Sequence, residues 1–304
     1  MSGDSMTAPA GTAYAPGEAI LEVSGLVKHF PLTQGVVIKR QVGAVKAVDG
    51  VSFDLTRGET LGIVGESDCG KSTVAKLVTH LETPTAGRIR YKGEDITRLS
   101  GKALKAVRRN IQIVFQDPYT SLDPHQSLRR VLDEVQQVQF SRPKAEREAR
   151  TRELLDAVGL AEKEARALPR ELSGGQRQRA AIARALATEP KVLILDEAVS
   201  ALDVSIQAQI LNLVADLRRE FRLTYILISH DLTVVRQVAD EVLVMYRGRV
   251  VEQGPVATIL KAPQHPYTQR LLESVPRPGM SLVRRKAKLE LDETGCLFRG
   301  RCPK

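Results

Sequence analysis

Two short apolar runs, Val192–Leu195 and Tyr225–Ile228, constrain the fold of this chain most strongly. Both are apolar on their two alternating faces, so each must be covered from both sides. Strands of this kind are typical of the centre of a largely parallel sheet that lies between layers of helices. Similar runs at Leu61–Val64 and Ile111–Phe115 alternate with segments of helical period such as 205–219. The alternation predicts an α/β fold.

The other regions complete a predicted organisation around this sheet. Edge strands are expected at 20–26, 51–55 and 242–246. Between about 120 and 180 the strand-like runs vanish, and helical segments replace them at 126–139, 144–158 and 175–187. Prolines after residue 255 mark an appended segment. We therefore predict a flexible tail at 1–18, an α/β core at 19–118 and 180–255, a helical subdomain at 119–179 and a C-terminal extension at 256–304.

Composition restricts the class of protein. The 304 residues are 42% apolar and 27% charged, as in ordinary globular proteins. Lys and Arg number 45 against 36 Asp and Glu, so we expect an anionic partner: a nucleotide, a nucleic acid or the cytoplasmic face of a membrane. Residues 1–18 lack a secretory signal pattern, and no 18-residue stretch is apolar enough to span a bilayer. Three cysteines are too few for a disulfide framework, which indicates a reducing compartment.

The segment between the strand at Leu61–Val64 and the helix expected at 71–81 has the pattern of a phosphate-binding loop, G-x-x-x-x-G-K-[ST]. In such a loop the backbone N–H groups and the start of the helix hold a polyphosphate. Lys71 would reach the β- and γ-phosphates of a nucleotide, and Ser72 would bind Mg²⁺. The alternative is a glycine turn with a solvated lysine. The candidate nucleotide-binding residues are Gly65, Glu66, Ser67, Asp68, Cys69, Gly70, Lys71, Ser72 and Thr73.

Asp68 places a carboxylate within a loop that is built for an anion. At about 5 Å and an effective dielectric constant near 20, the repulsion is roughly 3 kcal/mol for each phosphate charge. Mg²⁺ or an outward side chain would cancel most of it, and Asp tolerates a positive φ angle better than most residues. We expect Asp68 to weaken nucleotide binding without abolishing it.

Polar residues follow several of the predicted strands. Asp196 and Glu197 end the strand at 192–195, His230 follows the strand at 225–228, and Gln116 follows the strand at 111–115. The carboxyl ends of parallel strands share one edge of a sheet, where ligands bind in open α/β folds. Asp196 is suited to hold Mg²⁺ and Glu197 to act as general base on a water molecule. A solvated acidic pair and a structural histidine are the alternatives for these residues.

A second helix start has the features of an anion site. The sequence Leu-Ser-Gly-Gly-Gln at 172–176 precedes the helix expected at 175–187. Ser173 is a favourable N-cap, and Gly174 and Gly175 expose N–H groups at the helix start. One chain needs only one phosphate loop, so this second site is expected to serve the nucleotide of another copy.

Together these motifs resemble the ATP-binding subunits of ABC transporters. The resemblance rests on the phosphate loop or Walker A motif (65–72), the Q-loop (Gln116), the signature (172–176), Walker B (192–197), the D-loop (200–203) and His230. It covers about residues 20–275. The segments 114–124, 265–268 and 295–303 resemble the oligopeptide and dipeptide importer branch.

The resemblance implies a fold: a RecA-like P-loop NTPase core with a mixed sheet, a helical subdomain, an antiparallel β edge and a short C-terminal extension. It also implies two such ATPases packed head to tail, each ATP lying between Walker A of one and Ser173, Gly174, Gly175 and Gln176 of the other. Phe30 would stack on adenine, Gln116 would sense Mg²⁺ and the attacking water, His230 would contact the γ-phosphate, and Asp203 would lie near the nucleotide.

The partners that the resemblance implies are two membrane permeases, a second ATPase and, through the complex, an external solute-binding protein, but no nucleic acid. Residues 117–124 would receive a cytoplasmic helix of the permease, and the chain would lie on the cytoplasmic face of the cell membrane. A soluble ATPase that acts on nucleic acid or ribosomes, and a largely non-hydrolysing partner with a degenerate ATP site, are the alternative functions.

Three features depart from the family pattern. Asp68 replaces a usual Gly, and Ala198-Val199 replace a usual Pro-Thr after the catalytic Glu. Some members carry four cysteines for a [4Fe-4S] cluster, whereas this C-terminal segment has Cys296 and Cys302 alone. Two thiolates cannot complete such a cluster, so free thiols are the alternative.

The positive charge is concentrated at 88–109, which carries eight Lys and Arg against Glu94 and Asp95. We expect that patch to face a nucleotide, a partner or anionic lipid rather than DNA.

Overall fold

The computed structural model describes residues 17–34, 40–118, 121–200, 202–274 and 296–302. Most of the predicted N-terminal tail, residues 1–16, lies outside that range, as do Tyr119, Thr120 and Ala201. No helix in the described ranges is long and apolar enough to cross a membrane.

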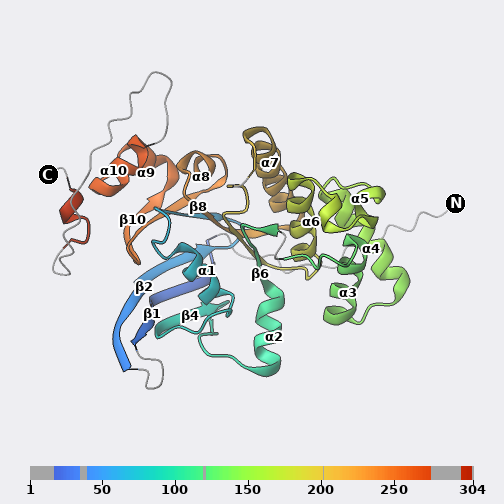
Figure 1. Ribbon diagram of the computed structural model, residues 1–304, viewed down its shortest axis with the longest axis horizontal. Helices are drawn as coiled ribbons and strands as arrows, with labels where there is room; N and C mark the ends of the chain where they lie inside the picture. The colour runs from blue at the N-terminus through green and yellow to red at the C-terminus, as the bar shows by residue number, and fades with distance from the viewer. Residues whose placement is uncertain (1–16, 35–39, 119–120, 201, 275–295, 303–304) are drawn as a thin grey trace.

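A six-stranded sheet forms the centre of the molecule (Figure 1). Its spatial order is β10-β9-β3-β8-β7-β6, and all neighbours are parallel except β10 and β9. The strands are β3 (Thr60–Val64), β6 (Ile111–Val114), β7 (Val192–Asp196), β8 (Thr224–Ser229), β9 (Glu241–Tyr246) and β10 (Arg249–Pro255). The predicted central strands at 192–195 and 225–228 are confirmed.

The prediction that 242–246 forms an edge strand is wrong. This segment lies in β9, which pairs in parallel with β3 on one side and with β10 on the other. Arg247 and Gly248 both have positive φ, of 46° and 79°, and form the tight turn that brings β10 onto the edge. Residues 242–246 are all buried. Their uninterrupted apolar run is the same signal that marks the central strands.

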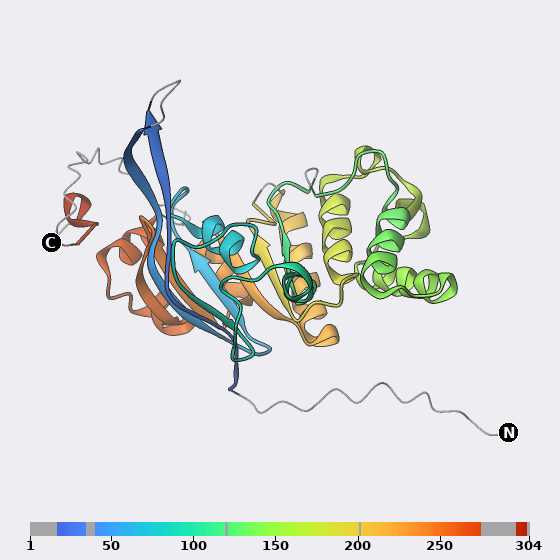
Figure 2. The ribbon, with the colours of Figure 1, turned by 90° about the horizontal axis from the view of Figure 1, so that it is seen from below.

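A second, antiparallel sheet has the order β2-β1-β4-β5. Its strands are β1 (Ala19–Gln34), β2 (Arg40–Thr56), β4 (Ala86–Tyr91) and β5 (Glu94–Asp95). Of the expected edge strands, 51–55 lies in β2, which is an edge of this sheet. The segment 20–26 lies in β1, which pairs with β2 on one side and with β4 on the other, so the prediction of an edge strand there is wrong. Figure 2 shows the long β1–β2 hairpin extending beyond the rest of the molecule.

The helices cover the parallel sheet and form a lobe beside it (Figures 1 and 2). The lobe contains α3 (Leu128–Phe140), α4 (Lys144–Ala157), α5 (Glu162–Arg166) and α6 (Gly174–Leu186). The other helices are α1 (Lys71–Val78), α2 (Gly101–Asn110), α7 (Val204–Phe221), α8 (Leu232–Val238), α9 (Val256–Lys261) and α10 (Pro266–Glu273). Helix α6 runs without a break across the subdomain boundary that the sequence suggested at 179/180.

Alternate residues of each central strand enter two different apolar clusters. Leu193 and Leu195 of β7 pack in the cluster that includes α6, α7 and α8, whereas Val192 and Ile194 pack in the cluster that includes α1 and the antiparallel sheet. Burial of apolar surface contributes roughly 25 cal/mol per Å². The parallel sheet is thus stabilised by apolar contacts on both faces.

Candidate functional site

The loop from Gly65 to Gly70 connects β3 to α1 and requires glycine at both ends. Gly65 and Gly70 have φ angles of 156° and 106°. A Cβ atom on Gly65 would lie 2.2 Å from the carbonyl oxygen of Met245, and one on Gly70 would lie 2.1 Å from that of Ala47. Any side chain would collide with this backbone. The loop is therefore pressed against β9 and β2, which fixes its path at the carboxyl end of β3.

Lys71 lies inside this loop. Its side chain is buried, and its Nζ donates hydrogen bonds to the carbonyl oxygens of Gly65 (2.9 Å) and Glu66 (2.8 Å). The same ammonium lies 3.9 Å from Oε1 of Glu197. A buried cation at a helix start, surrounded by a strongly turned backbone, is suited to bind an anionic ligand.

Ser72 and Asp196 are brought together from positions 124 residues apart. The Ser72 hydroxyl donates to Oδ1 of Asp196 at 2.9 Å. Burial raises the pKa of Asp196, and the hydrogen bond from Ser72 lowers it in part. A buried carboxylate and a hydroxyl are the oxygen ligands that Mg²⁺ prefers, and a divalent cation would compensate the cost of burying this carboxylate. These residues fit a magnesium ion.

Glu197 lies between two basic groups. Its φ angle is 49°, and its backbone N–H donates to the carbonyl oxygen of Ile228 at 3.0 Å, which holds the turn after β7. The carboxylate is 3.9 Å from Nζ of Lys71 and 3.7 Å from Nδ1 of His230. A positive φ at a non-glycine residue stores strain and is often found at functional positions.

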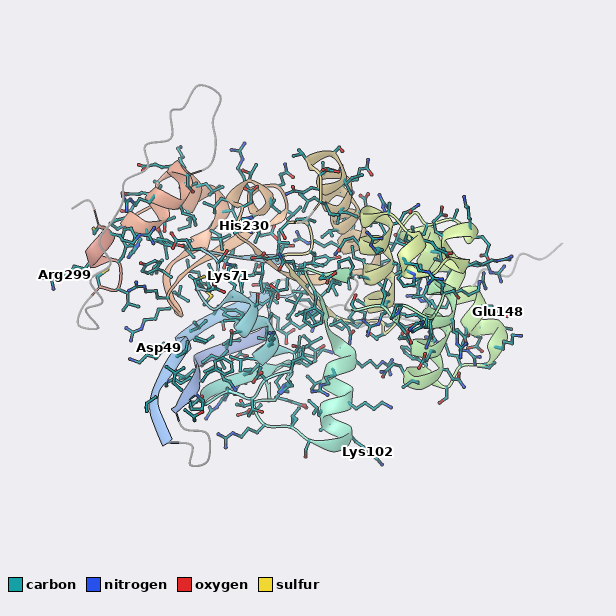
Figure 3. All side chains as sticks on the ribbon, viewed as in Figure 1. Asp49, Lys71, Lys102, Glu148, His230 and Arg299 are labelled. Atoms are coloured by element: carbon teal, nitrogen blue, oxygen red, sulfur yellow. The ribbon has the colours of Figure 1, made fainter. Side chains whose placement is uncertain are left out.

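Gln116 and His230 complete the same edge. Nε2 of Gln116 donates to Oγ of Ser200 at 3.4 Å, and that hydroxyl donates to the carbonyl oxygen of Glu197 at 2.9 Å. The His230 side chain is half exposed. Figure 3 shows Lys71 and His230 near the middle of the molecule, with Glu148 far away in the helical lobe. The loops that follow β3, β6, β7 and β8 therefore meet at one place.

The signature segment has the cap that its sequence predicts. Oγ of Ser173 accepts from the backbone N–H of Gln176 at 3.3 Å, and Oε1 of Gln176 accepts from the N–H of Ser173 at 2.8 Å. A Cβ atom on Gly175 would lie 2.8 Å from Cγ2 of Ile206, so this helix start packs closely on α7. Helix α6 lies in the lobe, apart from α1 (Figures 1 and 2). One chain does not bring its signature to its own phosphate loop.

Phe30 and Asp203 have less distinctive surroundings. Phe30 is half-buried on β1, beside Nζ of Lys28, which lies 4.9 Å from the ring centroid. It pairs across the hairpin with Val45, which is 49% exposed. Asp203 stands at the N-cap position of α7 without a side-chain cap hydrogen bond. Adenine stacking by Phe30 and the place of Asp203 near the nucleotide therefore stay predictions.

The three departures from the family pattern differ in their surroundings. Asp68 has a φ angle of 62° and is exposed, as its conformational tolerance allows, while Ala198 and Val199 are buried. Cys296 is exposed and Cys302 is half-buried. Within the described ranges, no three His, Cys, Asp or Glu residues form a group that could hold a metal ion. The two thiols of Cys296 and Cys302 do not by themselves fit a four-cysteine cluster.

The basic segment at 88–109 lies on β4, β5 and α2, and part of its charge is compensated locally. Arg88 pairs with Asp95 at 3.3 Å and Arg90 with Glu22 at 3.8 Å. Figure 3 places Lys102, at the start of α2, well away from Lys71. That end of the patch therefore does not lie at the phosphate loop of its own chain.

Two contacts to the phosphate loop were missed by the sequence analysis. The hydroxyl of Tyr267 accepts a hydrogen bond from the N–H of Glu66 at 2.8 Å, and Arg301 binds the Glu66 carboxylate through two hydrogen bonds of 2.9 Å. Arg301 lies 235 residues from Glu66. A long-range pair of this kind leaves no periodic or spacing signal in one sequence.

The loop at 65–70, the buried Ser72–Asp196 pair and the neighbouring Glu197 have the arrangement that is expected of a P-loop nucleotide-hydrolysing site. A family model described as ABC transporter matches residues 48–200, and one described as Oligopeptide/dipeptide transporter, C-terminal region, matches residues 251–304. The chain is 50% identical over 296 residues to the Bacillus subtilis oligopeptide transport ATP-binding protein AppF, with 94% of this chain and 90% of that protein covered.

Other relatives agree. Identity to the Escherichia coli dipeptide transport ATP-binding protein DppF is 46% over 292 residues, covering 94% of this chain and 87% of that protein. The structure of cbiO1 from Clostridium perfringens, part of the ABC transporter complex cbiONQ, superposes with a TM-score of 0.70 at 31% identity, covering 80% of this chain and 91% of that chain. A dimeric structure of a post-hydrolysis state of the ATP-binding cassette MJ0796, bound to ADP and Pi, superposes with a TM-score of 0.68 at 28% identity. The match covers 78% of this chain and 98% of that chain.

The chain belongs to the family of ABC transporter ATP-binding subunits. The predicted P-loop NTPase fold is confirmed, and so is the interpretation as a transport-coupled ATPase over the nucleic-acid, ribosome and non-hydrolysing alternatives. Membership implies the use of ATP and Mg²⁺.

Proposed function

We propose that this chain hydrolyses ATP to drive an importer of dipeptides or oligopeptides. The residues from Gly65 to Thr73 hold the phosphates, with Lys71 as the counter-charge. Ser72, Asp196 and Gln116 hold Mg²⁺, which supplies charge compensation on the phosphates when bound. Glu197 accepts a proton from the attacking water, and His230 orients the terminal phosphate.

One observation carries this proposal: Glu197 lies within 4 Å of both Lys71 and His230, and its neighbour Asp196 is bonded to Ser72. A general base must lie next to the group that holds the phosphate and next to the metal. The strand order brings all of these residues to one sheet edge, although they span residues 71 to 230. A solvated acidic turn would not need this convergence.

The proposed active form is a head-to-tail pair, in which Ser173, Gly174, Gly175 and Gln176 of one copy close over the nucleotide of the other. The capped start of α6 exposes backbone N–H groups outside the phosphate loop of its own chain. Phe30 stacks on adenine from β1, and Asp203 lies at the contact between copies. The second copy is this chain or a paralogue.

A groove beside the Q-loop supports a permease as the partner. It has a volume of about 340 Å³ and is lined by residues that include Ser121, Asp123, Val131, Val135 and Arg184. Val138 of α3 also lines the groove and is 56% exposed. Its mixture of apolar and polar walls suits an amphipathic helix. We propose that a cytoplasmic helix of one permease docks here and that the second permease docks at the same groove of the partner ATPase, with the ATPases on the cytoplasmic face of the cell membrane.

The peptide cargo is proposed on the C-terminal match and on the relatives, which are named for oligopeptide and dipeptide transport. Selection of the cargo lies with the permeases and with an external solute-binding protein, because no part of the site described above would contact a peptide.

Substitution of the general base tests the chemistry. Glu197→Gln is expected to lower ATP turnover at least about 100-fold, because general base catalysis contributes that much. The variant should still bind ATP, since Lys71 and Ser72 are intact, and it should accumulate as a dimer in size-exclusion chromatography with ATP. Glu220→Gln, on the exposed end of α7, is the control. Unchanged turnover in Glu197→Gln would refute the assignment.

Co-purification tests the partners. Detergent-solubilised membranes of cells that carry a tagged copy should yield this chain with two polytopic permeases. Recovery of the chain with nucleic acid or ribosomes instead of permeases would contradict the proposed role in transport. Loss of the permeases on Val138→Glu, with ATP binding unchanged, would place the contact at the groove.

A further inference from the structure

The C-terminal segment 296–302 lies against the phosphate loop. Its Phe298 is 1% exposed and packs at a ring-centroid distance of 5.4 Å from Tyr246 and 5.5 Å from Tyr267. Arg270 of α10 donates to the carbonyl oxygen of Arg301 at 2.8 Å. The segment is therefore anchored to β9 and α10 by an aromatic cluster and a hydrogen bond. We call residues 296–302 the C-terminal clasp.

The clasp contacts the phosphate loop at one residue, Glu66. Nη1 and Nη2 of Arg301 each donate to one carboxylate oxygen of Glu66, at 2.9 Å. This two-pronged geometry fixes the orientation of the carboxylate more firmly than a single hydrogen bond does. The ion pair raises the pKa of Arg301. The guanidinium also cancels a negative charge that would otherwise stand at the entrance of an anion-binding loop.

The peptide groups of Glu66 extend this contact toward the ligand. Its N–H donates to the Tyr267 hydroxyl at 2.8 Å, and its carbonyl oxygen accepts from Nζ of Lys71 at 2.8 Å. Tyr267 is 1% exposed, so its hydroxyl is fixed in place. The side chain of Glu66 is thus bonded to Arg301 of the clasp, its N–H to the hydroxyl of Tyr267 on α10, and its carbonyl oxygen to the ammonium of Lys71. A shift of the clasp must displace one of these groups.

We propose that Arg301 is a positioning residue for ATP, which acts through Glu66 to hold the Walker A loop and the Lys71 ammonium in the binding arrangement. The inference rests on the proposed function, because it needs ATP to bind at residues 65–73. Coupling between two sites is reciprocal: if a docked clasp favours ATP, then bound ATP must favour the docked clasp. The C-terminal segment of this chain is thereby part of its nucleotide site.

The first test is the affinity of the full-length chain for ATP with Mg²⁺, measured by calorimetry. Arg301→Ala is expected to bind about five-fold more weakly, the range of a partly exposed ion pair with good geometry. Arg301→Lys should recover part of the loss. In a chain that already carries Glu66→Gln, Arg301→Ala should not weaken ATP binding further. If Arg301 were merely structural, Arg301→Ala would weaken ATP binding in that chain as well. Arg236→Ala, which removes an exposed guanidinium from α8, is the matched control.

The second test uses a thiol that the clasp already carries. Cys302 packs against the apolar cluster, whereas Cys296 is exposed. In a Cys296→Ser chain, ATP should slow the alkylation of Cys302 several-fold, and Arg301→Ala should speed it and reduce the effect of ATP.

The outcomes separate the two proposals. If the wild-type chain binds no ATP, or binds it as well after Lys71→Ala, the proposed function fails and this inference fails with it. If the wild-type chain binds ATP but Arg301→Ala binds equally well, or ATP leaves Cys302 alkylation unchanged, the clasp is only a structural attachment and this inference alone is overturned.

Discussion

Asp68 shows how a single unusual residue is accommodated in a functional loop. Its φ angle of 62° lies in the left-handed region that Gly would occupy freely, and its side chain is exposed. Water therefore screens the carboxylate, and the repulsion toward a phosphate at about 5 Å falls to roughly 1 kcal/mol per charge. The backbone of the loop therefore keeps its conformation, and the repulsion lowers the affinity for ATP.

Replacement of Asp68 measures that cost. Asp68→Gly is expected to tighten ATP binding about five-fold, the equivalent of roughly 1 kcal/mol. Asp68→Asn removes the charge and retains a residue that tolerates the same backbone, so it should give most of the gain. Equal affinities for all three chains in calorimetry would show that the charge has no influence.

Gly70 has a steric role that can be separated from its backbone conformation. Gly70→Ala would place a Cβ atom 2.1 Å from the carbonyl oxygen of Ala47, at a φ angle of 106°. We expect a loss of at least about 3 kcal/mol in the free energy of unfolding, measured with urea. Gly93→Ala, at a φ angle of 79° in open space, should cost about 1 kcal/mol. Equal losses of unfolding free energy in Gly70→Ala and Gly93→Ala would show that the contact with Ala47 has no influence.

At the scale of elements, an ion network joins the two sheets. Asp49 of β2 accepts from Arg249 of β10 at 2.9 and 2.6 Å, and it lies 3.1 Å from Nε2 of His29 on β1. The hydrogen bond from Arg249 is the largest influence and lowers the pKa of Asp49 below its usual value of 3.8. The ionised form is the one that stabilises the folded chain.

This network predicts a dependence of stability on pH. Because the pKa of Asp49 is lower in the folded chain, its contribution is complete above the unfolded pKa near 4 and is lost as the pH falls through the folded value. Asp49→Asn is expected to lower the free energy of unfolding by about 1 kcal/mol at pH 7 and by progressively less below about pH 4. Asp54→Asn, exposed on β2, is the control. If the difference in the free energy of unfolding between the wild-type chain and Asp49→Asn stays constant down to pH 3, the ionised Asp49 is not the source of the stabilisation.

The elements also show what the sequence could predict. Continuous apolar runs predicted β7 and β8, and the phosphate-loop pattern predicted α1, because these signals are local. Strand order is not local: β9 is an interior strand because it pairs with residues of β3 about 180 positions earlier and because the turn at Arg247 and Gly248 brings β10 onto its other side. The meeting of Arg301 with Glu66 depends in the same way on the completed fold. Most of the candidate site was predictable, but its attachment to the C-terminal segment was not.

At the scale of the whole molecule, the parallel sheet is shared by both apolar clusters. Leu217 of α7 belongs to one cluster and Leu77 of α1 to the other, and both are fully buried. Neither layer can lose its contacts without exposing a face of the same strands. The two layers are therefore expected to unfold together.

Two truncations test this coupling. Leu77→Ala and Leu217→Ala should each cost about 2–5 kcal/mol, the range for buried leucines. Each variant should still show one unfolding transition in urea, with the same midpoint by circular dichroism and by tyrosine fluorescence. Val138→Ala, at an exposed apolar side chain, should change the midpoint little. Two separate transitions would show that the layers are independent.

The order of strands in the sheet also has a consequence for synthesis of the chain. The phosphate loop follows β3, yet β3 is flanked by β8 and β9, and the register pairs Thr60 with Tyr225 and Leu61 with Glu241. A ribosome therefore completes the loop about 160 residues before either neighbour of its strand exists. Contacts of such long separation form slowly and leave apolar edges open in the meantime. The nascent chain acquires a nucleotide site only after β8 and β9 have been synthesised, so growing chains should depend on chaperones until β9 has emerged.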